Sequence, residues 1–92
     1  MLFDIKMISI MPEKIKSIFD PKYRDFVASL VARRQSVHIT QRELAKRLGV
    51  SHCYVARIET HERRIDLTES IAMMQVLGMS NDEIIEEIKK LL

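Results

Sequence analysis

Polar side chains that can bond to nucleic-acid bases cluster within residues 51–57 of the chain. They are Ser51, His52, Cys53, Tyr54 and Arg57. A guanidinium such as that of Arg57 can bond guanine O6 and N7 bidentately, and a tyrosine such as Tyr54 can bond a phosphate or touch a thymine methyl group. The spacing of His52, Cys53 and His61 offers no plausible zinc set. The residue types therefore predict hydrogen bonding to DNA, with Arg57 as the leading base contact, and no metal site.

Two short amphipathic helices are expected to position these residues. Thr40 can cap the first helix, and Glu43 follows at the position of a capping-box partner. The apolar face of this helix consists of Leu44, Ala45 and Leu48. Gly49 stands where a left-handed residue would end the helix. Ser51 can cap the second helix, whose apolar positions are Val55 and Ile58, flanked by Cys53 or Ala56.

Two helices joined by a short turn containing Gly make a helix-turn-helix, whose second helix can enter a major groove. In this docking mode the first turn of the second helix points at base edges, and a residue one turn further along reaches the same groove. Cys53 fits two readings, because it is small enough to be half-buried filler or to face a base. The motif predicts a DNA-binding regulator.

The same stretch resembles the Cro and phage-repressor superfamily, often called the XRE family. The family pattern is T-Q-x-x-L-A-x-x-L-G-V-S with a later I-E, and an Arg precedes it at the end of the first helix. The matching residues are Arg34, Thr40, Gln41, Leu44, Ala45, Leu48, Gly49, Val50, Ser51, Ile58 and Glu59. This resemblance implies an all-α, five-helix, lambda-repressor-like domain with the helix-turn-helix at its second and third helices.

Several residue roles are also implied by the resemblance. Arg34 and Glu59 should form a semi-buried ion pair, whose loss would cost about 3–5 kcal/mol. Gln41 should contact the DNA and brace the recognition helix, and His52 and Cys53 match positions that read bases in relatives. One departure is Thr60-His61, where the family has Gly or Asn-Gly. Because His tolerates positive φ better than most residues, we expect the turn to be kept.

Charge is distributed unevenly along the chain. Residues 33–64 carry eight basic and three acidic side chains, a net charge of +5, whereas residues 65–92 carry two basic and six acidic ones, a net charge of −4. Ordinary solvated helix faces would also produce charge runs, but the positive block coincides with the motif, where a polyanion would dock. The expected phosphate contacts are Gln41, Arg42, Lys46, Arg47, Arg63 and Arg64.

Further helices are expected on either side of the motif. Asp20-Pro21 is a strong helix start, and it precedes an apolar stripe of Tyr23, Phe26, Val27, Leu30 and Val31 that ends near Arg34. After a polar loop over residues 60–66, Asp66 can cap a helix with Leu67, Ile71, Met74 and Leu77, which Gly78 stops. Ser80, with Glu83 as capping-box partner, can begin a last helix that carries Ile84, Ile85, Ile88, Leu91 and Leu92.

The two ends of the chain suggest different roles. Residues 1–19 form an expected N-terminal arm, either disordered or packed on a partner subunit, and Met7 and Met11 are alternative starts. Residues 20–92 form the expected DNA-binding domain. Since one motif contacts few bases, specific binding usually needs two half-sites. We expect a homodimer whose interface is the C-terminal apolar run of Ile84, Ile85, Ile88, Leu91 and Leu92.

Composition narrows the class of protein further. A chain of 92 residues with 47% hydrophobic residues, two glycines and two prolines suits one helical domain. A single Cys fits a reducing cytosol, and the sequence has neither a run of membrane-span length nor a signal peptide. We expect a cytoplasmic protein without a cofactor. Paired carboxylates, an activated nucleophile and a Gly-rich phosphate loop are not recognisable, so an enzyme is not expected.

Two functions remain compatible with the sequence. The first is a sequence-specific regulator of double-stranded DNA, a repressor rather than an activator, that binds a two-fold symmetric operator as a dimer. The second is an antitoxin that binds a toxin or another protein partner and regulates its own synthesis by binding DNA. An N-terminal arm that orders only on a partner would favour the second function.

Overall fold

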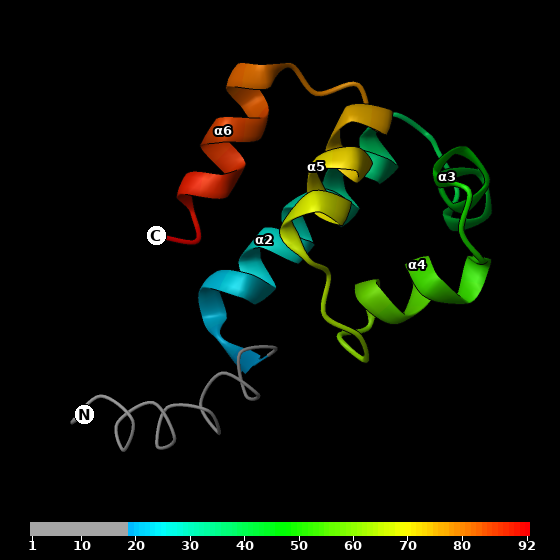
Figure 1. Cartoon of the computed structure of the whole chain (residues 1–92), viewed down its shortest axis with the longest axis horizontal. Coiled ribbons are helices and arrows are strands. Elements are labelled where there is room, and N and C mark those ends of the chain that lie inside the picture. Colours follow the sequence, from blue (N-terminus) through cyan, green and yellow to red (C-terminus); the bar gives the residue numbers. More distant parts are fainter. Residues whose placement is uncertain (1–18) are drawn as a thin grey trace, which may run out of the picture.

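The chain is described by a computed structural model over residues 19–92, and the predicted arm, up to residue 18, lies outside the described part. The described residues form five helices and no strands, which confirms the predicted all-α fold. The helices are α2 (Pro21–Ser36), α3 (Gln41–Leu48), α4 (His52–Glu59), α5 (Leu67–Val76) and α6 (Asn81–Lys89). Figure 1 shows α2 and α5 in the centre, with α3 and α4 on one side and α6 on the other.

Each helix begins at a side chain that satisfies an otherwise unpaired backbone N–H group. The N-cap residues are Asp20, Thr40, Ser51, Asp66 and Ser80, as predicted. The expected capping box at Ser80 and Glu83 is complete, and a second one joins Asp66 to Glu69. The expected box at Thr40 is only half formed, because the Glu43 carboxylate accepts a hydrogen bond from Arg47 Nε at 2.9 Å instead.

The core is built from residues of all five helices and of the loop before α5. Its buried apolar residues are Tyr23, Phe26, Val27, Leu30, Leu44, Ala45, Val55, Ile58, Ile65, Met73, Met74, Leu77 and Ile84. The loop before α5 is anchored from inside, since Ile65 is buried and its N–H donates to the Tyr23 hydroxyl at 3.1 Å. The polar composition of residues 60–66 gave no indication of this anchor.

Leu67, one of the apolar residues expected along this helix, does not belong to the core. Leu67 is 58% exposed although Ile65 before it and Ser70 after it are buried, so its side chain lies on the outer side of the first turn of α5. The buried residue of that turn is Ser70, whose hydroxyl donates to the Leu67 carbonyl at 2.8 Å. The helix therefore meets the core through Met73, Met74 and Leu77, and its N-terminal apolar side chain stays outside.

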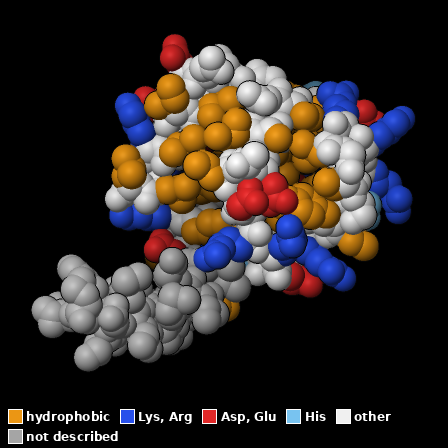
Figure 2. All heavy atoms as spheres, in the orientation of Figure 1, with side chains coloured by type: hydrophobic (Ala, Val, Ile, Leu, Met, Phe, Trp, Pro, Cys, Tyr) orange, Lys and Arg blue, Asp and Glu red, His pale blue; other side chains and the backbone are white. Residues whose placement is uncertain are grey.

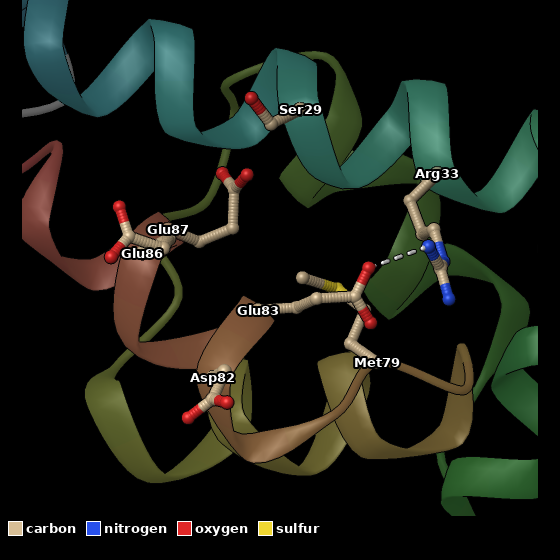
Figure 3. A pocket seen from close by; sticks show the side chains of 7 residues that line it. All are labelled: Ser29, Arg33, Met79, Asp82, Glu83, Glu86 and Glu87. Atoms are coloured by element: carbon tan, nitrogen blue, oxygen red, sulfur yellow. Dashed lines mark hydrogen bonds and ion pairs between the residues drawn. The ribbon is translucent and has the colours of Figure 1, made fainter.

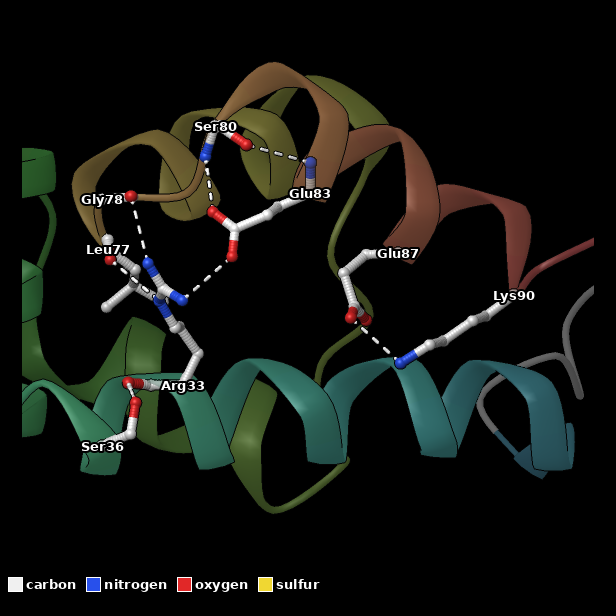
Figure 4. A network of polar contacts seen from close by, with 8 residues as sticks. All are labelled: Arg33, Ser36, Leu77, Gly78, Ser80, Glu83, Glu87 and Lys90. Atoms are coloured by element: carbon white, nitrogen blue, oxygen red, sulfur yellow. Dashed lines mark hydrogen bonds and ion pairs between the residues drawn. The ribbon is translucent and has the colours of Figure 1, made fainter.

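A polar clamp from α2 holds the turn between α5 and α6 (Figure 4). Arg33 donates to the carbonyls of Leu77 at 3.2 Å and Gly78 at 3.1 Å, and it pairs with Glu83 at 3.3 Å. These bonds satisfy carbonyl groups at the end of α5 that have no partner within the helix. At the other end of α6, Lys90 donates to Ser29 Oγ at 3.2 Å. Helix α6 is thus attached to α2 at both of its ends.

Left-handed backbone occurs at the turns that the motif requires. Gly49 has φ 73° and ψ 30° and ends α3, as predicted. His61 has φ 65°, so the turn after α4 is kept without the family's usual glycine. His38, at φ 60°, also has left-handed backbone, and no sequence pattern indicated this conformation.

Replacing Gly49 with alanine should lower the free energy of unfolding by about 1 kcal/mol, the cost of holding an L-residue in the left-handed region. A Cβ at this position meets nothing within 4 Å, so strain in the backbone is the whole effect. Urea unfolding of Gly49→Ala and Gly49→Asn would measure it. Since Asn visits this region readily, Gly49→Asn should lose less, and equal losses would contradict the explanation.

Candidate nucleic-acid interface

Helices α3 and α4 form a helix-turn-helix whose inner faces are buried. Leu44 and Ala45 of α3 pack with Val55 and Ile58 of α4 in the core. The turn is closed by the Val50 N–H, which donates to the Ala45 carbonyl at 3.0 Å. The outer face of α4 exposes three of the predicted base-contact residues, which are Ser51, Cys53 and Arg57. Burial of one face therefore fixes which side of α4 is available to a ligand.

Arg34 and Glu59 are paired in the structure and join the end of α2 to the end of α4. Arg34 Nε lies 2.6 Å from one carboxylate oxygen of Glu59, and its Nη2 lies 3.0 Å from the other. Arg34 Nη1 also donates to the Ile39 carbonyl at 2.8 Å. Only 11% of the Arg34 side chain and 13% of the Glu59 side chain is exposed. The bidentate geometry fixes the orientation of α4 relative to α2.

Gln41 and His52 extend this pair into a network that reaches the first turn of α4. Gln41 Nε2 donates to Glu59 Oε1 at 2.8 Å, and Gln41 Oε1 lies 3.2 Å from His52 Nε2. Both side chains are half-buried. The structure thus brings two predicted DNA contacts together, and one ring nitrogen of His52 is already engaged in the absence of DNA.

The predicted phosphate contacts lie on the same part of the molecule as the motif. Lys and Arg side chains stand out along the edge formed by α3 in Figure 2. Arg42 and Lys46 of α3 are exposed and have no hydrogen-bond or ion-pair partner among the described residues. Arg47 pairs with Glu43 at 2.9 Å, an interaction that lowers the pKa of the Glu43 carboxyl group. Arg63 and Arg64 are exposed in the loop between α4 and α5.

Tyr54 is turned toward α5 rather than outward with its neighbours on α4. Its ring packs against the core and lines a small cavity with Leu48, Val50, Glu69 and Ala72. The Arg63 guanidinium covers the ring at 4.6 Å from its centroid and lies 3.5 Å from Glu69. No pattern in the sequence indicates this packing, because it depends on residues from the loop and from α5.

Burial, followed by the nearby Glu69 carboxylate, raises the pKa of Tyr54 to about 12. Because the folded protein favours the neutral phenol, this residue's contribution to stability is complete below pH 10 and is lost as the pH rises from 10 to about 12. An ultraviolet titration of tyrosinate should therefore show a component near pH 12 that disappears in Tyr54→Phe. A Tyr54 midpoint near 10 would contradict the packed position of the ring.

A cavity of about 320 Å³ lies between α2 and α6, away from this interface (Figure 3). Four acidic residues of α6 line it, namely Asp82, Glu83, Glu86 and Glu87. Hydrogen bonding with Ser80 and the Arg33 guanidinium lower the pKa of the Glu83 carboxyl group, so its negative charge is favoured. The charge of this cavity would repel a phosphate backbone. Among the described residues, no group of His, Cys, Asp and Glu could hold a metal ion.

A helix with an exposed outer face, a short turn closed by a backbone hydrogen bond and adjacent exposed basic side chains define a helix-turn-helix DNA-binding protein. Comparison with known families agrees, since a helix-turn-helix family model matches residues 30–84. The chain belongs to this family, the Cro/C1-type or XRE helix-turn-helix proteins. Searches among curated proteins and among solved structures find no match to this chain.

Membership of the family makes the chain a DNA-binding helix-turn-helix regulator. Proteins of this family bind double-stranded DNA. They have regulatory functions and are typically not enzymes. Within residues 19–92, no helix has the length and apolar character needed to cross a bilayer.

Proposed function

We propose that this chain is a sequence-specific transcriptional repressor that binds a two-fold symmetric operator as a homodimer. The observation that carries the proposal is the outer face of α4, which presents exposed side chains on a helix held by a semi-buried ion pair. Cys53 in the first turn and Arg57 in the last turn are both exposed, and the Arg57 side chain has no hydrogen-bond or ion-pair partner among the described residues. An exposed guanidinium of this kind is available for base readout, because no ion pair within the protein has to be broken when the complex forms.

The contacts divide by what each side chain can reach. Ser51, His52 and Cys53 at the groove-facing start of α4 serve base readout, together with Arg57 one turn further along the helix. Arg42, Lys46, Arg63 and Arg64, with Gln41 at the start of α3, serve the phosphate backbone, and Arg47 does so less because Glu43 competes for it. Tyr54 contributes through its position under Arg63, which it holds in the loop.

A second copy of the chain is proposed to pair through α6. Of the five predicted interface residues, Ile84 lies in the chain's own core and Ile88 packs partly against it. The outer part of the run remains exposed and consists of Ile85, Leu91 and Leu92. Lys89 and Lys90 are already paired with Glu86 and Glu87 of the same segment, so charge does not drive the pairing. Two α6 helices that pack against each other would cover the exposed apolar residues.

Ile85→Ser should weaken the dimer roughly tenfold, since about 1.5 kcal/mol of apolar burial would be lost. Sedimentation equilibrium at several concentrations would measure the change in dissociation constant. Leu67→Ser is the matched control, because Leu67 is also exposed but lies on α5. Loss of dimer in both variants would mean that the interface extends beyond α6, and no loss in either would contradict pairing through α6.

The proposed function is tested by selecting sites from a random duplex library and titrating the winner by fluorescence anisotropy at two salt concentrations. We expect a two-fold symmetric site whose half-sites are about 34 Å apart. Binding should weaken with salt, with a log–log slope of about −0.9 for each phosphate neutralised. Weak binding without sequence preference would contradict the proposal and direct the search to a protein partner, as for an antitoxin.

A further inference from the structure

We propose that His52 is a specificity-determining residue that recognises a base amino group, N6 of adenine or N4 of cytosine. In this reading the neutral imidazole carries its proton on Nε2 and accepts a hydrogen bond at Nδ1. The inference rests on the proposed function, because it assigns a particular readout to the groove-facing end of α4. It follows from the order of hydrogen bonds between α2, α3 and α4.

The first step is the state of Glu59. Its two oxygens accept hydrogen bonds from Arg34 at 2.6 and 3.0 Å, so the carboxylate is ionised and paired with a guanidinium. An ionised carboxylate only accepts hydrogen bonds. Any third group that bonds to Glu59 must therefore be a donor.

The second step is the orientation of the Gln41 amide. Its NH₂ group must face Glu59, 2.8 Å away, because a carbonyl oxygen there would oppose a carboxylate oxygen. The amide oxygen consequently faces His52 Nε2 at 3.2 Å. Since that oxygen can only accept, the His52 Nε2 atom must carry a proton. The tautomer is thus set by the charge of Glu59, two hydrogen bonds away.

The third step concerns the remaining nitrogen of the ring. In the neutral tautomer with a proton on Nε2, Nδ1 is an acceptor. It has no hydrogen-bond partner among the described residues, and His52 is only half-buried. In the major groove, adenine N6 and cytosine N4 are the amino donors, whereas guanine and thymine present acceptors. An acceptor at Nδ1 therefore favours adenine or cytosine and disfavours the other two bases.

The test combines the tautomer with the base preference. The NMR nitrogen chemical shifts of the His52 ring in the free protein at neutral pH should show the proton on Nε2. Site selection should then reveal one position where adenine or cytosine is preferred about two- to tenfold, the contribution of one hydrogen bond. His52→Ala should abolish the preference at that position alone, and the selected base distinguishes the adenine from the cytosine amino group.

Gln41→Lys provides the inverted case. An ammonium group has only donors, so it can bond Glu59 and also donate to His52 Nε2, which moves the ring proton to Nδ1. The same position should then prefer guanine or thymine. The added charge strengthens binding to every sequence alike, so the ratio of affinities between bases still reports the readout. If this variant does not fold, the wild-type chain and His52→Ala still decide the question.

Three outcomes would overturn the inference: a proton on Nδ1 of the neutral wild-type ring, a wild-type preference for guanine or thymine at the His52-dependent position, or a base preference that His52→Ala leaves intact. Failure of the proposed function looks different, because it would appear as binding without any base preference. In that case the chemical shifts would still report whether Gln41 and Glu59 set the tautomer.

Discussion

Glu59→Gln is expected to lower the free energy of unfolding by about 3 kcal/mol. The substitution leaves the Arg34 guanidinium semi-buried without a counter-charge, a situation that costs about 3–5 kcal/mol for fully buried pairs. The slight exposure of both partners places the effect at the low end of that range. The new amide would also turn an NH₂ group toward the donors of Arg34 or Gln41. Urea unfolding monitored by circular dichroism would measure the loss.

Glu86→Gln is the matched control for this prediction. Glu86 also pairs with a basic residue, Lys89 at 3.3 Å, but 70% of the Glu86 side chain and 60% of its partner are exposed. An exposed pair contributes at most about 1 kcal/mol, so this variant should be nearly as stable as the wild type. If the two variants lost the same amount, the pair between α2 and α4 would have no special structural role.

Arg57→Ala is expected to weaken binding to the selected operator by about 1–3 kcal/mol per half-site and to relax discrimination at one base pair. The reason is that the exposed guanidinium on α4 can bond guanine O6 and N7, a pattern that no other base presents. The affinity for random duplex should change much less. Competition titrations with operators that vary at each position would locate the affected base pair.

Lys46→Ala supplies the comparison for Arg57. Lys46 is exposed on α3 and is expected to contact phosphate. Its loss should weaken binding to all sequences about equally and reduce the salt slope by about 1. If Arg57→Ala behaved in the same way, Arg57 would be a phosphate contact. The difference between the two variants therefore separates base readout from charge neutralisation.

The helices and the motif were predictable because their signals are local. A capping side chain acts on an N–H group two or three residues away, so Asp20, Thr40, Ser51, Asp66 and Ser80 could be read directly from the sequence. The left-handed turn at Gly49 is equally local. The pairing of Arg34 with Glu59 spans 25 positions, and the family resemblance implied it where no local pattern could.

Other features depend on contacts between elements and could not be read in this way. The Tyr54 ring was expected at the groove because of its position on α4, but Arg63 and Glu69 hold it against α5. Leu67 has the spacing of an apolar helix position, but its side chain lies on the exposed side of the first turn of α5. The clamp formed by Arg33 was likewise not anticipated, because a carbonyl acceptor has no signature in the sequence.

Two neighbouring arginines at the end of α2 hold two other parts of the molecule in place. Arg34 fastens the recognition helix, and Arg33 fastens the turn that leads into α6. In the proposed dimer, the separation of the two recognition helices would therefore be transmitted through one residue pair in each subunit. The distance between the two recognition helices of such a dimer would be fixed. An operator with a base pair inserted between its half-sites should therefore bind poorly even when both half-sites are unchanged.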